Sequence, residues 1–173
     1  MILLYWAPIS AILALLFALW LWVKVKTAGM GSPKMVEIAG AIQEGAMAFL
    51  KREYSYLALF VVVLGVVLAF TINLLTALSF LVGALLSAAA GYIGMKVATE
   101  ANVRTAQAAR KGVGRALTLA FSSGTIMGMM VAGLGLLGLG ILYIFIRDPA
   151  IVNGYALGAS STALFARVGG GIF

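Results

Sequence analysis

Long stretches without a charged residue are the feature that most limits the fold of this chain. Residues 2–23, 54–95 and 116–146 contain no Asp, Glu, Lys or Arg. A helix of roughly 20 apolar residues is enough to cross a bilayer core about 30 Å thick. Only 10% of the residues are charged and 64% are hydrophobic, whereas soluble domains are about a quarter charged. The sequence therefore predicts a membrane protein.

The charge-free stretches predict an all-α fold, a polytopic bundle of about five transmembrane helices. The second stretch is too long for one helix, and the polar residues Asn73 and Thr76 divide it. The predicted spans are residues 2–23, 53–72, 76–97, 116–146 and 149–173, with loops at 24–52 and 98–115. In a signal peptide the positive charges precede the apolar run, whereas Lys24 and Lys26 follow it. A retained first span is therefore favoured over a cleaved signal.

Basic residues predict the orientation of the bundle. They gather between spans one and two and between spans three and four, at Lys24, Lys26, Lys34, Lys51, Arg52, Lys96, Arg104, Arg110, Lys111 and Arg115. The opposite side holds only Arg147, next to Asp148. Cytoplasmic loops are enriched in Lys and Arg, so we expect both basic loops in the cytoplasm and the N-terminus outside. The net charge of +7 is then a topology signal and does not indicate nucleic-acid binding.

The chain lacks the usual residues of a catalytic or metal site. It has no cysteine and no histidine, and its five acidic residues are widely separated along the sequence. We therefore predict no catalytic residue and no metal ligand within these 173 residues.

The basic segments also contain local structure. Ser32 and Pro33 are a typical helix start, and the apolar residues that follow recur at helical spacing. This pattern favours a short amphipathic helix on the membrane surface that leads into span two, with a partner-binding helix as the alternative. The loop around Arg104–Arg115 is open to three interpretations: a site for anionic lipid, a site for a soluble partner, or a topology signal alone. Gly112 is expected to lie in a turn.

Small residues recur every four positions in two spans. They are Ser79, Gly83, Ser87 and Gly91 in the third span, and Ala116, Ala120, Gly124, Gly128 and Ala132 in the fourth. Such faces allow close helix packing in membranes, which we favour over a hydroxyl-lined pore. We expect leucine at Gly83 or Gly128 to reduce the yield of folded protein.

The last predicted span is polar as well as small. It ends in "ALFARVGGGIF", where Arg167 precedes Gly169, Gly170 and Gly171. Charges within a membrane are costly and are usually paired with acids, although an arginine can also extend to the headgroups. Three glycines weaken a helix, which suggests close packing or a bend. No acidic residue of this chain is an obvious partner for Arg167.

Three segments resemble the membrane-bound, ion-translocating inorganic pyrophosphatases. They are "AIQEGAMAFLKREY" at 41–54, "SAAAGYIGMKVATEANVRTAQAAR" at 87–110 and "GYALGASSTALFARVGGGIF" at 154–173. The resemblance implies a homodimeric pump of about sixteen spans per subunit in the cell membrane. Such a pump hydrolyses pyrophosphate with Mg²⁺ and moves H⁺ or Na⁺ outward. A requirement for K⁺ is left open.

In this resemblance Arg167 matches an arginine of the ion path or gate, and spans one to four belong to an outer ring of helices. The family continues after the glycines with threonine, lysine and aspartates that bind magnesium pyrophosphate, whereas this sequence ends at Phe173. We expect the chain to be the N-terminal part of a longer pump. The alternative is a non-catalytic membrane subunit or scaffold of packing helices.

Overall fold

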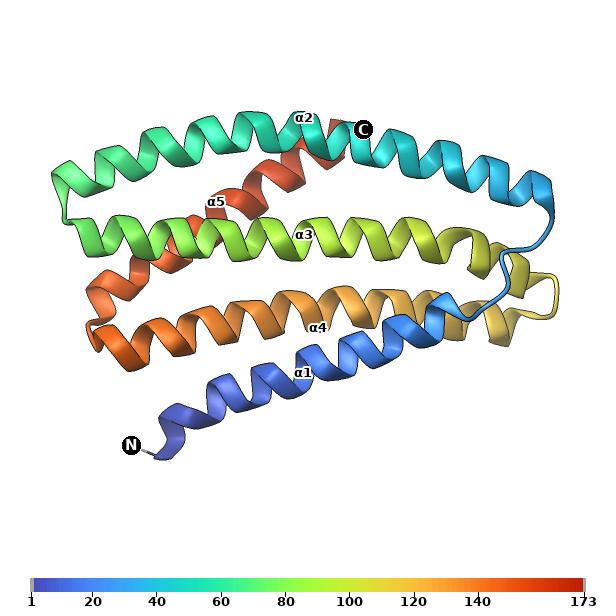
Figure 1. Cartoon of the computed structure of the whole chain (residues 1–173), viewed down its shortest axis with the longest axis horizontal. Coiled ribbons are helices and arrows are strands. Elements are labelled where there is room, and N and C mark those ends of the chain that lie inside the picture. The colour runs from blue at the N-terminus through green and yellow to red at the C-terminus, as the bar shows by residue number, and fades with distance from the viewer. Residues whose placement is uncertain (1, 173) are drawn as a thin grey trace.

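The computed structural model describes residues 2–172, with side chains for residues 5–169. These residues form α1 (Ile2–Lys26), α2 (Pro33–Thr71), α3 (Leu74–Ala109), α4 (Val113–Ile146) and α5 (Pro149–Ile172), with no strand in the described part of the chain. Four helices lie side by side in the order α2, α3, α4, α1, and α5 crosses α3 at an angle (Figure 1). The all-helical fold predicted from the sequence is confirmed.

Short polar connections set the ends of the helices. The Asn73 side chain accepts a hydrogen bond from the Thr76 amide at 2.7 Å, so a two-residue turn is enough to reverse the chain between α2 and α3. Ser32 caps α2 in the same way, as predicted. Gly112, at φ 127°, provides the predicted turn before α4, with a backbone conformation that favours glycine.

One local prediction is wrong, because α2 is a single helix of 39 residues. The separate surface helix predicted before the second span does not form, since no proline or turn residue interrupts the chain between Ala46 and Tyr54. At 1.5 Å per residue α2 is about 58 Å long, roughly twice the hydrocarbon thickness. The first half of α2 therefore continues beyond the apolar layer as an extension of the membrane helix.

Four helices, α1 to α4, are long and apolar enough to cross a membrane. Within the described residues α5 is not among them, although its 24 residues give it the necessary length. Polar residues such as Asn153, Ser160 and Arg167 lower its hydropathy. Large hydrophobic side chains point outward elsewhere: Phe70 is 88% exposed and Phe145 is 82% exposed. This exposure suits a lipid environment.

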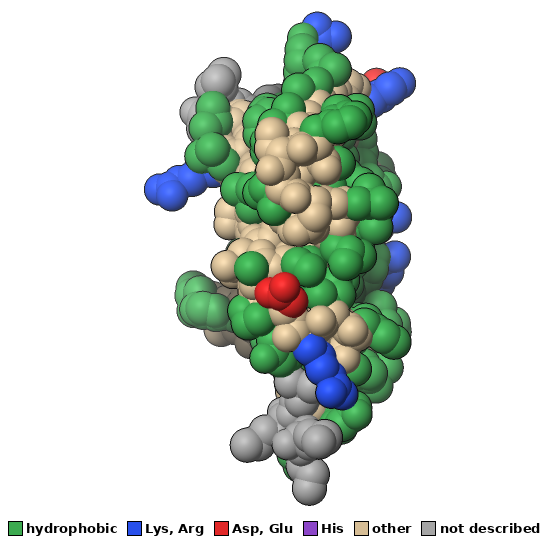
Figure 2. All heavy atoms as spheres, turned by 90° about the vertical axis from the view of Figure 1, so that its left-hand side faces the viewer, with side chains coloured by type: hydrophobic (Ala, Val, Ile, Leu, Met, Phe, Trp, Pro, Cys, Tyr) green, Lys and Arg blue, Asp and Glu red, His purple; other side chains and the backbone are tan. Residues whose placement is uncertain are grey.

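Most of the charges lie at one end of the bundle, which we call the basic end. It comprises the last turns of α1 and α3, the first half of α2 and the first turns of α4. The opposite end contains the α2–α3 and α4–α5 turns, where Arg147 stands beside Asp148. Figure 2 looks onto that opposite end and shows mainly hydrophobic side chains and backbone. The asymmetry matches the charge pattern behind the predicted orientation, which itself stays a prediction.

Glu100 of α3 joins α1 to α3 at the basic end. The Trp22 indole donates to the Glu100 carboxylate at 2.9 Å, and the Lys26 ammonium lies 3.7 Å from the same oxygen. Arg104, which is buried, donates to the Lys26 carbonyl at 3.5 Å and to the Glu100 carbonyl. Beneath this cluster α1, α3 and α4 share a core of Ala18, Leu21, Val25, Val97, Ala101, Ile126 and Met130.

Trp22→Phe is expected to destabilise the protein by about 1.5–3 kcal/mol, because it removes the hydrogen bond to a charged carboxylate. Thermal unfolding of the purified protein in detergent measures the change. Trp20→Phe is the matched control, since the Trp20 ring contacts Phe17 and Lys24 but donates no hydrogen bond among the described side chains. Equal destabilisation by both variants would contradict the role of the Glu100 bond.

Candidate functional site

The α5 helix is held against α3 by backbone contact at glycines of both helices. A Cβ atom at Gly83 of α3 would overlap the Tyr155 carbonyl, and one at Gly158 of α5 would overlap the Phe80 carbonyl. A Cβ atom at Gly154 would likewise collide with the Thr76 carbonyl. Membrane helices gain dispersion contacts when small residues allow such an approach. The glycines therefore fix the position of α5 on α3.

Side-chain hydroxyls strengthen this seat. The Ser87 hydroxyl donates to the Ala159 carbonyl at 3.1 Å, and the Thr162 hydroxyl donates to the Ala84 carbonyl at 3.3 Å. The Tyr155 hydroxyl donates to α4 carbonyls at 3.0 and 3.2 Å. The Ser87 hydroxyl therefore takes part in helix packing, the role that the sequence favours over the lining of a pore. Through the hydroxyls of Thr162 and Tyr155, α5 is anchored to α3 and α4 at once.

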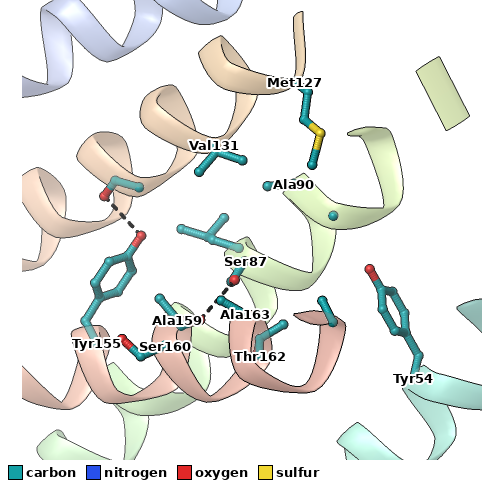
Figure 3. A pocket seen from close by; sticks show the side chains of 14 residues that line it. Tyr54, Ser87, Ala90, Met127, Val131, Tyr155, Ala159, Ser160, Thr162 and Ala163 are labelled. Carbon is teal, nitrogen blue, oxygen red and sulfur yellow. Dashed lines mark hydrogen bonds between the residues drawn. The ribbon is translucent and has the colours of Figure 1, made fainter. Parts of the chain in front are cut away.

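A cavity of about 480 Å³ lies between α3, α4 and α5 and is bordered by Tyr54 of α2. Figure 3 shows Met127 and Val131 of α4 facing Ala159, Ser160 and Ala163 of α5 across it. The lining is mostly apolar, and its Tyr54, Ser87, Tyr155 and Thr162 hydroxyls already donate to backbone carbonyls. The cavity has the size of a ligand pocket but offers no ready set of ion ligands.

One face of α5 is not covered by the described chain, and it carries three polar residues among exposed apolar ones such as Leu157 and Leu164. Asn153, Ser160 and Arg167 are all exposed and are spaced seven residues apart. Seven residues make almost two helical turns, so the three side chains form a stripe about 21 Å long. Ser160 also lines the cavity, which places the stripe along its edge.

Arg167 stands at the far end of this stripe. It lies about 27 Å along α5 from Pro149, close to the thickness of the hydrocarbon core. Among residues 5–169 no carboxylate forms an ion pair with Arg167. The role of Arg167 in an ion path stays a prediction.

Glu53 is a residue that sequence reasoning did not select. Its Oε1 atom is buried without a hydrogen-bond partner and would lie 3.0 Å from a Cβ at Gly169. Phe49 is 3.2 Å from the same position, so Gly169 packs against α2. Because helical residues two apart point in different directions, Glu53 does not face Arg167. The sequence did contain a signal for Glu53, because it is an acidic residue at the first position of the second predicted span.

The other predicted glycines divide into two groups. A Cβ atom at Gly91 would lie 3.1 Å from the Tyr54 hydroxyl, so this glycine is also in close contact. At Gly124 and Gly128 a Cβ atom would meet no described atom within 4 Å. The described residues do not supply the packing predicted there, because α4 approaches α1 and α3 closely at Gly133, Gly138 and Gly140 instead. The side-chain positions of Gly170 and Gly171 lie outside the described residues.

Acidic and other metal-binding side chains are scattered over the described part of the structure. They include no group of three His, Cys, Asp or Glu residues that could hold a metal ion. What the arrangement provides is a helix packed tightly against α3, with an uncovered face that carries a polar stripe and the permanent charge of Arg167. Such a face can contact another helix or a water-filled path within a membrane protein.

Comparison with known proteins identifies a family. The family model of the inorganic H⁺ pyrophosphatases, which describes their sequences, matches residues 12–173 of this chain. A putative K⁺-stimulated pyrophosphate-energised sodium pump of Clostridium tetani is 52% identical over 97% of this chain and 25% of its own length. A K⁺-insensitive pyrophosphate-energised proton pump of Methanosarcina mazei is 44% identical over 99% of this chain and 26% of its own length. The chain thus spans about a quarter of these relatives.

Proposed function

Because the chain belongs to the inorganic H⁺ pyrophosphatase family, we propose that it forms the N-terminal helices of a pyrophosphate-energised ion pump. In this proposal the longer protein hydrolyses pyrophosphate at the cytoplasmic side of the cell membrane and moves H⁺ or Na⁺ outward. The relatives are named as proton pumps and sodium pumps, which supports the pump over a non-catalytic scaffold. The N-terminus of the chain lies outside the cell in this arrangement.

The uncovered stripe of Asn153, Ser160 and Arg167 on α5 is the observation that carries the proposal. A guanidinium within or at the edge of the apolar layer is expensive to keep there unless it faces protein or water. The relatives are about four times as long as this chain, so further helices are available to cover that face. We assign α5 to the ion path, Arg167 to its gate, and α1 to α4 to the supporting outer layer.

We further propose Mg²⁺ as the cofactor and a homodimer as the assembly, with the K⁺ requirement set elsewhere in the protein. The described residues do not fit a magnesium site, since they lack a cluster of carboxylates. No hydrolytic step is therefore assigned to this chain. Its own contribution is to hold α5 at a fixed depth and to present the charge of Arg167.

Inverted membrane vesicles that contain the longer protein test this function. Adding pyrophosphate and Mg²⁺ should release phosphate and drive H⁺ or Na⁺ into the vesicle lumen, measured with a pH-sensitive dye and with radioactive sodium. Vesicles without the protein are the control. Vesicles that contain the protein but show neither phosphate release nor ion uptake would exclude the pump and leave the scaffold.

A further inference from the structure

Three aromatic side chains are paired with cations in a common arrangement. Lys24 lies 5.3 Å from the Trp20 ring centre and Lys26 lies 4.7 Å from that of Trp22, both on α1. On α2, Arg52 lies 5.2 Å from the ring centre of Tyr56. Each pair is four residues apart and therefore on one helix face.

In all three pairs the direction from the aromatic ring to the cation is the same along the bundle, although α1 and α2 run in opposite directions. On α1 the cation follows the aromatic residue, and on α2 it precedes it. In each case the ring lies one turn nearer the apolar middle, and the cation lies one turn nearer the basic end. This is the order in which aromatic and basic residues occur at a membrane–water interface.

Helix length places these cations at the membrane boundary. Arg52 lies about 28 Å along α2 from Thr71, and Lys24 lies about 33 Å along α1 from Ile2. Lys96 lies about 33 Å along α3 from Leu74. These distances match the hydrocarbon core of about 30 Å. The cations therefore lie at the depth of the lipid headgroups.

Two of the pairs carry charge that the described side chains do not neutralise. Trp20 and Tyr56 are 57% and 56% exposed, and neither Lys24 nor Arg52 forms an ion pair with a described carboxylate. Lys26 differs because it is paired with Glu100. We propose that the Trp20–Lys24 and Tyr56–Arg52 pairs bind the phosphate headgroups of anionic membrane lipids. The ring contacts the upper acyl region while the cation contacts the phosphate.

Lys111 and Arg115, the cations at the tip of the basic end, serve as controls for the cations at the membrane boundary. α3 continues about 20 Å beyond Lys96, and Lys111 follows its end, with Arg115 in the first turn of α4. At physiological ionic strength charges are screened over about 8 Å, so Lys111 and Arg115 are too far from the headgroups to attract them strongly. Removing them changes the net charge equally without touching the boundary.

The test measures lipid preference at the tryptophans. Lipids with brominated chains quench tryptophan fluorescence on contact, and the part of the signal that a Trp20→Phe variant loses belongs to Trp20. Brominated phosphatidylglycerol, which is anionic, should quench at lower concentration than brominated phosphatidylcholine, which is neutral overall. Lys24→Gln should lower the phosphatidylglycerol affinity roughly fivefold at this site, while Lys24→Arg should retain it. Lys111→Gln with Arg115→Gln should leave it unchanged.

The site on α2 is measured by the amount of phosphatidylglycerol that co-purifies with the protein. Lys24→Gln with Arg52→Gln should lower the affinity of each of the two sites about fivefold, so less lipid should co-purify, whereas the tip variants should not change the amount. Equal quenching by the two lipids in the parent protein would overturn the proposal, as would equal losses in the boundary and tip variants. Displacement of the lipid by equimolar free phosphate or pyrophosphate would also overturn it, because it would show a general anion site.

Discussion

Gly83→Leu is expected to abolish recovery of folded protein, whereas Gly128→Leu in the same chain should be recovered normally. At Gly83 the first side-chain carbon already overlaps the Tyr155 carbonyl of α5. The obstruction is backbone, which cannot rotate away as a flexible side chain can. At Gly128 an added Cβ atom meets no described neighbour within 4 Å. The yield of monodisperse protein after detergent extraction, measured by size-exclusion chromatography, distinguishes the two.

Alanine at the same two positions should change the stability of the protein in opposite directions. Alanine favours a helix over glycine by about 1 kcal/mol, so Gly128→Ala should stabilise the chain slightly. Gly83→Ala gains the same amount but must separate α3 from α5, and overpacking costs about 1–3 kcal/mol or more. Thermal unfolding should therefore move in opposite directions for the two variants. A stabilising effect at Gly83 would show that α5 does not lie where the structure places it.

The sequence predicts a loss of folded yield for leucine at either glycine, whereas the described residues leave open space at Gly128 alone of the two. The repeat that contains Gly124 and Gly128 has the spacing of a packing face, and the sequence gives no way to tell which side of α4 faces α3. That choice depends on the rotation of the helix, which Gly133 and Gly138 set through contacts with α1, α3 and α5. The longer relatives leave room for another helix to cover the open face.

The positions of the helices could be predicted because the causes are local. Charge-free runs mark the apolar helices, and Asn73 and Gly112 mark the turns between them. The continuity of α2 was missed, because amphipathic and apolar segments follow each other without a break and look like separate elements. Hydropathy therefore locates a membrane boundary inside a helix without showing that the helix continues through it.

Only part of the candidate site could be predicted from the sequence. Arg167 is conspicuous, since it is the one charge in an otherwise uncharged segment from Pro149 onward. Glu53 is not conspicuous, because it directly follows Lys51 and Arg52 and resembles a solvated boundary residue. Only the approach of Gly169 shows that its carboxylate faces α5. Contacts between residues this far apart in the chain have no local pattern.

Arg167→Ala in the longer protein is expected to uncouple ion transport from pyrophosphate hydrolysis. The guanidinium lies at the end of the uncovered polar stripe of α5. In the proposed pump it faces acidic groups on helices outside this chain. Removing one member of a buried ion pair costs about 3–5 kcal/mol, because the remaining charge is left uncompensated. Ion uptake per pyrophosphate hydrolysed should fall about tenfold or more in vesicles.

Two further variants separate a gate from a structural role. Arg167→Lys keeps the charge but loses the planar fork of donors, so it should restore only part of the coupling. Arg115→Ala removes an exposed cation at the tip of the basic end and should leave both activities unchanged. Parallel loss of hydrolysis, transport and folded protein in Arg167→Ala would indicate that the arginine only holds α5 in place. Unchanged hydrolysis together with unchanged transport would reject the gate. The ions would then pass at the same rate whether or not the guanidinium is present.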